Sequence, residues 1–499
     1  DDQVAAPGLG VQDFYGMEEF GVREFLSLGV NVANGNLLVR DTDVKINAAG
    51  VATRSDRFFN GLSGRSGAFG PGWSMAGGHD VGLEVGASSV VFRGPSGFRA
   101  TFTGSGSSWT APSGLNATLT KNADGTWRVK QKRSGVTWSF TAGGYLTRHA
   151  DRNGVGLSYT YNADNTVASL TDAAGRVVTY AYSGGLVSKI TDSAGREYTY
   201  TYSGGRLASS RTPDGHTTSY SYTSAGRLSQ VRTARGVAVG IGYDTSGRVT
   251  SITRYTELNA GGDAQTTTFA YPSTSSTTQT DPRGNTWTYT RDTAGRVTAV
   301  KDPLGRSRSA SWTANSAVAT ATDAMGAGGT GGNVTTYSYD AANNPTQVKM
   351  PTGAVSSAVY TTGGACGSTD TANPDLPKCV TDDAGNSRAM RYDALGNLLS
   401  EADTTGGTTT GAKLEYTYQR AASATTGPDC GGKPGQRCTA KDPNGGVTSY
   451  RYDADGNMTR ISPPAPLGER VLEYDALGRL TAVTNGRGQR TTFSHDAQD

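Results

Sequence analysis

The sequence lacks any long run of apolar residues. A helix that crosses a bilayer needs about 18 or more such residues in succession, and none of the 499 positions begins a run of that kind. It also lacks a signal peptide, and the chain begins at Asp1 rather than Met. We therefore expect a processed product or a piece of a longer chain, without a helical membrane span.

Charge is scarce as well. Charged residues make up 18% of the chain and the formal net charge is +3, values that suit neither a nucleic-acid binder nor a polybasic membrane anchor. Neither H-E-x-x-H nor G-x-S-x-G occurs. The few histidines are scattered, at His79, His149, His216 and His495. We therefore expect no catalytic residues, no cofactor and no metal, and hence no enzyme.

Glycine and tyrosine are abundant instead. The chain contains 69 glycines and 24 tyrosines. Disordered chains are usually rich in charge and poor in aromatic residues, so this composition indicates an ordered β protein with many turns.

The tyrosines recur at a fixed interval, and the first four steps are 21, 20, 20 and 21 residues. Most later steps are similar, and each longer step contains an insertion. The aligned tyrosines are Tyr161, Tyr182, Tyr202, Tyr222, Tyr243, Tyr339, Tyr392, Tyr418, Tyr452 and Tyr474. The same phase also passes through Tyr271, Arg291, Trp312, Tyr360 and His495. A period held over about 340 residues indicates a repeat protein.

One repeat reads as one β-hairpin. In "GREYTYTY", Tyr198, Tyr200 and Tyr202 share one face of a strand and the intervening threonines share the other. A Gly-rich turn, a second strand and an Asp-x-x-Gly turn follow. We expect the tyrosine row to face a hollow and to hold adjacent hairpins together, with the Ser/Thr row facing solvent.

Stacked hairpins predict the fold class. A lone hairpin is unstable in water, but each edge can pair with the next unit. Sheets twist with a fixed hand, so a long one must coil. We expect an all-β protein in which a spiralling antiparallel sheet forms a hollow or partly open shell.

The repeat phrase resembles that of the RHS/YD-repeat family, whose signature is Tyr-Asp-x-x-Gly-(Arg/Asn)-(Leu/Val). The matching segments are "YDTSGRV" (243–249), "YDALGNL" (392–398), "YDADGNM" (452–458) and "YDALGRL" (474–480). The family includes bacterial polymorphic toxins, parts of insecticidal toxin complexes and animal teneurins. The resemblance implies a β-shell that, in bacterial members, holds a toxic C-terminal domain.

The N-terminal part is similar to the leader that precedes such repeats, in "VNVANGNLLVRDTDV" (30–44) and "RSDRFFNGLSGRSGAFGPGWS" (54–74). We therefore expect a tail or strap over 1–24 and a capping β-domain over 25–150. The repeat shell is expected over 151–499, truncated at its C-terminus. Four aromatic residues of the tail region are expected to dock onto the wall: Phe14, Tyr15, Phe20 and Phe25.

The sequence departs from the family at its end. The C-terminal self-cleavage core is missing, and "DPLGR" (302–306) occupies an ordinary turn. Two other motifs also read as loops rather than sites, since "GAGGTG" (326–331) precedes a strand and "DADGN" (453–457) lacks the spacing of a calcium loop. The leader tryptophans Trp73, Trp109, Trp127 and Trp138 are expected to pack a core, with sugar stacking as the alternative.

All four cysteines lie in two insertions. Local pairing of Cys366 with Cys379, and of Cys430 with Cys438, would pin a protruding loop in each case. A zinc site fits less well because the spacings within the pairs are 13 and 8; free thiols and other connectivities stay open. Disulfides favour an extracellular location.

These features give two functional hypotheses. The first is a secreted, non-enzymatic shell, of bacterial origin, that encloses and helps to deliver a C-terminal effector absent from this chain. The alternative is a structural or adhesive cell-surface protein, with a cell-surface or glycan partner. Neither hypothesis involves nucleic acid or a membrane span.

Overall fold

The protein is built almost entirely from strands. A computed structural model describes residues 8–255, 264–324, 332–405 and 408–497. Within those ranges the one helical element is a short 3₁₀ turn, η1 (Gly78–Asp80). The described part of the chain accordingly contains no helix with the length and apolar character of a membrane span.

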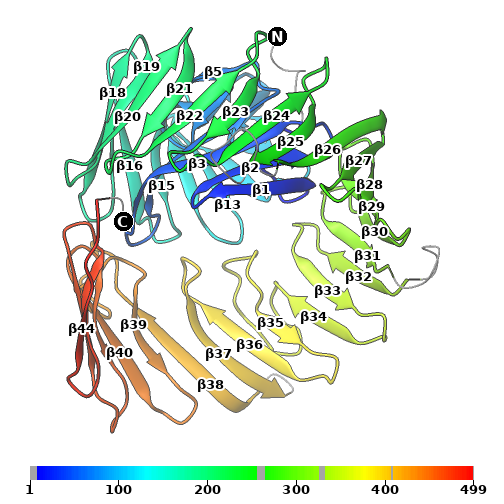
Figure 1. The fold of residues 1–499 in the computed structure, drawn as a ribbon. Helices are drawn as coiled ribbons and strands as arrows, with labels where there is room; N and C mark the ends of the chain where they lie inside the picture. Colours follow the sequence, from blue (N-terminus) through cyan, green and yellow to red (C-terminus); the bar gives the residue numbers. More distant parts are fainter. Residues whose placement is uncertain (1–7, 256–263, 325–331, 406–407, 498–499) are drawn as a thin grey trace.

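Most of the chain forms a single antiparallel sheet of 33 strands, β12 to β44, in which every strand pairs with the next one in sequence (Figure 1). We call this sheet the wall. Its first strands are β12 (Ala117–Lys121), β13 (Trp127–Gln131), β14 (Thr137–Phe140), β15 (Leu146–Ala150), β16 (Gly156–Tyr161), β17 (Val167–Thr171), β18 (Val177–Ser183), β19 (Leu186–Thr191), β20 (Glu197–Ser203), β21 (Arg206–Arg211), β22 (Thr217–Tyr222), β23 (Leu228–Arg232), β24 (Ala238–Tyr243), β25 (Val249–Tyr255), β26 (Ala264–Ser273), β27 (Ser276–Thr280) and β28 (Thr286–Arg291).

The wall continues in the same pattern to its last strand. These strands are β29 (Val297–Lys301), β30 (Ser307–Trp312), β31 (Val318–Thr322), β32 (Val334–Tyr339), β33 (Pro345–Lys349), β34 (Val355–Val359), β35 (Cys379–Thr381), β36 (Ser387–Tyr392), β37 (Leu398–Thr405), β38 (Thr408–Tyr418), β39 (Arg437–Lys441), β40 (Val447–Tyr452), β41 (Met458–Ser462), β42 (Arg470–Tyr474), β43 (Leu480–Thr484) and β44 (Arg490–Thr492). The predicted all-β, spiralling antiparallel sheet is confirmed.

The Asp-x-x-Gly turns join the hairpins in one repeated geometry. At the turn between β17 and β18, the Asp172 carboxylate accepts hydrogen bonds from the backbone N–H groups of Ala174 and Arg176. Gly175 takes a φ of 83°, a left-handed conformation that glycine adopts without steric cost. The Arg176 side chain returns to Asp172 at 2.8 Å and closes the turn.

The wall winds around until its turns meet turns laid down far earlier. Ser113 donates to the carbonyl oxygen of Ala314 at 2.7 Å, across a sequence separation of 201. Further along, the side-chain amides of Asn153 and Asn397 exchange two hydrogen bonds of 3.0 and 2.8 Å. Arg196 reaches the carbonyl oxygen of Ala497 at a separation of 301. We call this row of contacts the seam; it closes the coiled sheet upon itself (Figure 1).

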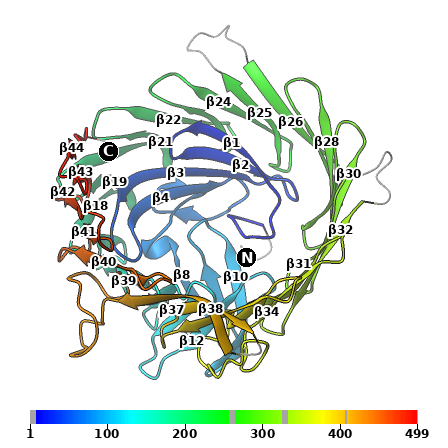
Figure 2. The ribbon, with the colours of Figure 1, turned by 90° about the horizontal axis from the view of Figure 1, so that it is seen from below.

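The leader forms separate small sheets. One has the strand order β1 (Met17–Arg23), β2 (Leu26–Asn31), β3 (Leu37–Ile46), β4 (Thr53–Asn60) and β7 (Trp73–Met75), and another pairs β5 (Ser66–Gly67) with β6 (Gly70–Pro71). A four-stranded sheet comprises β11 (Ser108–Thr110), β10 (Arg99–Ser105), β9 (Ser89–Arg93) and β8 (Gly82–Val85). Figure 2 shows the leader strands lying inside the ring that the wall forms.

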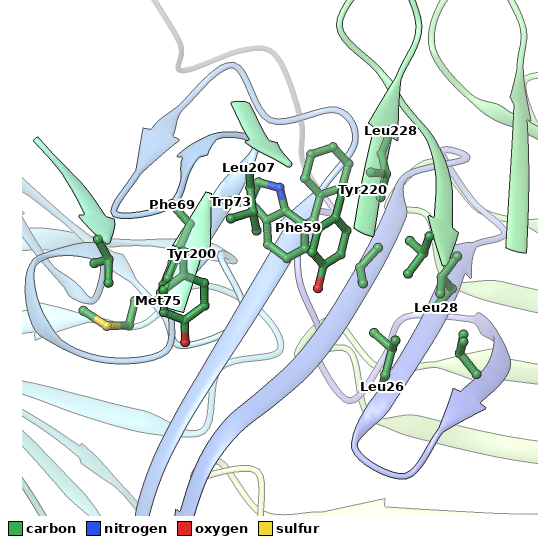
Figure 3. Packing of buried hydrophobic residues seen from close by; sticks show 14 of the residues in the cluster. Leu26, Leu28, Phe59, Phe69, Trp73, Met75, Tyr200, Leu207, Tyr220 and Leu228 are labelled. Atoms are coloured by element: carbon green, nitrogen blue, oxygen red, sulfur yellow. The ribbon is translucent and has the colours of Figure 1, made fainter. Parts of the chain in front are cut away.

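The main hydrophobic core lies between the leader and the inner face of the wall. Phe69 of the leader packs edge-on against Tyr200 of β20 at 4.9 Å between ring centroids. Trp73 packs in the same manner against Tyr220 of β22 at 5.1 Å (Figure 3). The tyrosine row therefore faces inward here, as the alternation predicts, because it is the apolar face of each strand.

The sheet continues through residue 150, the position at which the capping domain is expected to end. β15 and β16 pair directly across that position, and the wall begins at Ala117. The strands before residue 150 carry Trp127, Val129 and Phe140 in the inward positions instead of paired tyrosines, and the four-stranded leader sheet covers them. Alternation rather than tyrosine decides whether a strand can join the wall.

The tail region docks only in part. Phe20 lies against Phe269 of the wall, with ring centroids 6.4 Å apart, while Phe14 and Tyr15 contact each other. Phe25 does not dock, contrary to prediction: its side chain is 43% exposed, and Lys45 stacks on its ring at 4.8 Å. The tight turn between β1 and β2 holds Phe25 away from the wall.

Candidate functional site

The repeat tyrosines tie each hairpin to the one before it. Tyr182 donates from its hydroxyl to the carbonyl oxygen of Val167 at 2.9 Å, fifteen residues earlier. Equivalent bonds, from 2.6 to 2.9 Å, are made by Tyr161, Tyr202, Tyr243, Tyr339, Tyr392, Tyr418, Tyr452 and Tyr474. Where another residue replaces the tyrosine at this repeat position, it can make the same bond. Trp312 donates from Nε1 to the carbonyl oxygen of Val297 at 2.9 Å.

Tyr222 is the exception among the ten tyrosines. Its hydroxyl accepts a 3.0 Å hydrogen bond from Nε1 of Trp73, a leader residue. Burial raises the pKa of Tyr222 to about 12, so the hydroxyl stays neutral. At this repeat the tyrosine therefore holds the leader to the wall instead of joining two hairpins.

The arginine that follows a turn glycine stacks on the aromatic residue of the next repeat. Arg248 lies 4.4 Å from the centroid of the Tyr271 ring, and Arg206 lies 5.6 Å from that of Tyr222. Such cation–π contacts add on the order of 0.5–1 kcal/mol each at exposed sites. The Gly-Arg and Tyr-x-Tyr elements of the repeat phrase thus contact each other in space.

A buried ion cluster joins the leader to the wall. The guanidinium of Arg57 on β4 is fully buried and binds Asp43 at 2.6 Å and Asp41 at 2.9 Å. Tyr220 of β22 donates to Asp41 at 2.8 Å. Burial opposes the charge on Arg57, but the neighbouring carboxylates, Asp43 foremost, raise its pKa well above the usual range. Arg57 therefore stays charged inside the core.

The leader covers only part of the inner face of the wall. Tyr220 and Val231, which pair across β22 and β23, are 4% and 0% exposed beneath it. The corresponding pair in β32 and β33, Tyr337 and Val348, is only half-buried. We define the open inner face by the half-buried inward residues Val300, Tyr337, Val348, Tyr450 and Ile461. These five residues are apolar or carry a hydroxyl group, and the strand register places the charged side chains of Arg308, Arg388 and Glu401 on the same face.

Two disulfides join Cys366 to Cys379 and Cys430 to Cys438, the local pairing that the sequence favours. Their loops are held against the wall instead of protruding freely. Fully buried Lys378 binds the carbonyl oxygens of Ala372 and Asn373 at 2.6 and 2.8 Å. Asn373 in turn donates to the Asp393 carbonyl at 2.8 Å, in a neighbouring hairpin.

The other motifs adopt plain turn geometry where they are described. The Asp302 carboxylate accepts from the N–H of Leu304 and of Arg306, as in every such turn, and Asp453 is likewise saturated by its own turn. The described ranges contain no cluster of three or more metal-ligating side chains. The "GAGGTG" segment (326–331) lies outside the described residues.

Trp127 and Trp138 are buried in the core between the four-stranded leader sheet and the wall. Trp138 stacks on His149 with ring centroids 4.8 Å apart, and Trp109 packs edge-on against Trp127. The leader tryptophans therefore serve packing, as predicted, and Trp73 does so as well.

Comparison with known families identifies two elements. The RHS repeat model matches residues 161–197, 203–238, 277–307, 329–355, 435–465 and 474–499. A domain of unknown function, DUF6531, matches residues 29–102, within the leader. No curated protein matches the chain.

Among solved structures, similarity is found to the TcdB2–TccC3–Cdc42 complex, with 12% identity over 90% of this chain and 29% of the other, at a TM-score of 0.32. For the TcdB2–TccC3 protein without its hypervariable C-terminal region, the identity is 11% over 90% of this chain and 29% of the other, and the TM-score is 0.30. For the Tc holotoxin pore of Photorhabdus luminescens, the identity is 12% over 90% of this chain and 29% of the other, and the TM-score is 0.28. The chain thus spans less than a third of the length of these proteins.

Proposed function

Because the chain belongs to the RHS-repeat family, we propose that its wall is part of a secreted, non-enzymatic shell that encloses a C-terminal effector segment and helps to deliver it. The observation that supports this proposal is the open inner face. Its tyrosine, valine and isoleucine side chains form a surface that suits an unfolded polypeptide, since tyrosine offers apolar area together with a hydroxyl partner.

The division of the inner face is consistent with this role. The leader covers the inner surface from about β12 to β26 and anchors there through Arg57 and the aromatic pairs. The remaining inner positions combine apolar and tyrosine side chains with a few charged ones, and they have no covering layer within the described residues. An apolar surface of this kind is expected to have an occupant in the working protein.

The test is site-specific photo-crosslinking in the product of the complete gene. A benzoylphenylalanine at Val348, on the open inner face, is expected to crosslink to sequence that follows residue 499. The same probe at the exposed neighbour Gln347, on the opposite face, is the matched control. Enclosure would be contradicted if the probe at Val348 crosslinked only to other proteins in solution, or if the probes at Val348 and Gln347 crosslinked equally.

Adhesion at a cell surface, with or without a glycan partner, is the second candidate function. It would use the outer, Ser/Thr-rich face. In the same experiment adhesion predicts crosslinks from Gln347 to a cell-surface component and none from Val348 to the chain's own downstream sequence.

A further inference from the structure

The five-stranded sheet of the leader ends in a long edge strand, β1. In the described part of the chain, β1 pairs with β2 and with no other strand. Every second residue of an antiparallel pair turns its N–H and C=O away from its partner strand. Outside the β1–β2 ladder, no backbone–backbone hydrogen bond between described residues involves β1. A strand of seven residues therefore presents a row of donors and acceptors that have no backbone partner.

An edge of this length is unusual within the leader. Proteins protect the edges of sheets by keeping them short, by placing lysine or proline on them, or by covering them. The edge strands β7 and β11 span only three residues each, and β8 is bridged to the wall at Tyr145. β1 is longer and contains neither lysine nor proline. An edge of this kind is suited to accept a further strand.

The charged residues of β1 leave room beside it. Glu18 accepts a hydrogen bond from Tyr289 of the wall, and Arg23 is held in an ion pair within the leader. Glu19 and Gly21 lie on the opposite face from Glu18 and are exposed. A Cβ added to Gly21 would meet no other atom within 4 Å. There is thus open space on this face of the edge strand.

The other face of β1 is apolar and is turned to the wall. Val22 belongs to the main core and Phe20 packs against it, and β1 lies inside the ring that the wall forms (Figure 2). A strand added beside β1 would continue this face, so its alternate side chains would lie next to apolar neighbours. The edge therefore suits an extended polypeptide in which every second residue is apolar.

From these observations we infer that β1 is a docking edge for the enclosed polypeptide, one segment of which adds to the five-stranded leader sheet as a sixth strand. The backbone supplies the hydrogen bonds, and the alternating apolar side chains supply the selectivity. The inference rests on the proposed function, because its occupant is the polypeptide that the shell encloses. It adds that one segment of this polypeptide is ordered and paired through its backbone.

Hydrogen–deuterium exchange resolved to single residues tests the inference, by comparing this chain with the product of the complete gene. In this chain the amides of β1 should alternate between slow and fast exchange, since only every second N–H bonds to β2. In the complete product the fast set should slow by at least about tenfold, because those N–H groups then bond to the added strand. β20, which is paired on both sides, is the internal control and should exchange alike in both proteins.

The inference is overturned if the fast amides of β1 stay fast in the complete product. It is also overturned if they are already slow in this chain, or if they slow as the concentration of this chain rises, since the chain itself or a second copy would then cover the edge. Crosslinking from Val348 to the downstream sequence without protection of β1 would refute the docking and leave the proposed enclosure standing. Absence of both the crosslink and the protection would refute enclosure as well.

Discussion

The hydroxyl of Tyr202 donates a 2.6 Å hydrogen bond to the carbonyl oxygen of Val187, one hairpin earlier in the wall. The bond crosses the junction between two repeats, where backbone pairing alone would leave the sheet free to bend. Its recurrence along the sequence explains why the second tyrosine of the pair is kept while neighbouring positions vary. It is the contact that turns a row of hairpins into one wall.

Removing this hydroxyl should therefore weaken the wall measurably. Tyr202→Phe is expected to lower the free energy of unfolding by about 1 kcal/mol, the usual net value of one hydrogen bond. Tyr337→Phe is the control, because the Tyr337 hydroxyl has no hydrogen-bond partner within the described residues. It should change the free energy of unfolding by only a few tenths of the effect of Tyr202→Phe. Urea denaturation followed by tyrosine fluorescence measures both. Equal effects would contradict the assigned role.

Loss of the buried cation between leader and wall should cost more. Arg57→Met leaves Asp41 and Asp43 in the core without this partner and is expected to destabilise the protein by about 3–5 kcal/mol. Neutralising the carboxylates as well, in Arg57→Met/Asp41→Asn/Asp43→Asn, should recover much of the loss. Denaturation and protease protection of the leader are the measurements. A single variant as stable as the parent would show that the cluster does not anchor the leader.

Acid should weaken the wall through His149. Burial lowers the pKa of His149 from 6.5 to about 4, so the unfolded chain takes up a proton there at a higher pH than the folded one. Stability from this group is present above pH 6.5 and is lost as the pH falls toward 4, by up to about 3 kcal/mol.

His149→Phe keeps a ring against Trp138 and removes the titrating group. The difference in unfolding free energy between parent and variant, measured from pH 7 to 4.5, should grow in favour of the variant as the pH falls. A difference that does not change with pH would mean that His149 has the same pKa in the folded and the unfolded protein.

The disulfides should stabilise their own loops. Opening Cys430–Cys438 by a double serine substitution is expected to cost about 2–3 kcal/mol in the chain-entropy account. Peptide mapping without reduction should recover Cys366 joined to Cys379 and Cys430 joined to Cys438. Any cross-pairing between the two loops would refute the connectivity, and an unchanged unfolding midpoint in the double variant would refute the stabilisation.

Local pattern was enough to predict the hairpin unit. The alternation around Tyr198, Tyr200 and Tyr202 sets which side chains face inward, and the Asp-x-x-Gly turns set where each strand ends. These features depend on residues within one repeat, so they can be read from one repeat. The pairing of Cys366 with Cys379 was predictable for the same reason.

Contacts between distant segments were not predictable. Arg57 and Tyr220 are 163 residues apart, and nothing in either local sequence indicates that the leader enters the wall and lies on its inner face. The start of the wall before residue 150 was missed because Trp127 and Phe140 replace the expected tyrosines. The exposure of Phe25 follows from a turn conformation that its residue type disfavours.

The central claim is that the coiled sheet closes upon itself at the seam, and a crosslink tests it most directly. In an Asn153→Cys/Asn397→Cys variant, a short bismaleimide should join the two cysteines, since the native amides exchange two hydrogen bonds. The control pair is Thr160→Cys/Ser169→Cys, neighbours across one hairpin, with hydroxyls 2.6 Å apart. The account predicts that both pairs crosslink within one molecule; a control pair that links while the seam pair does not would contradict it.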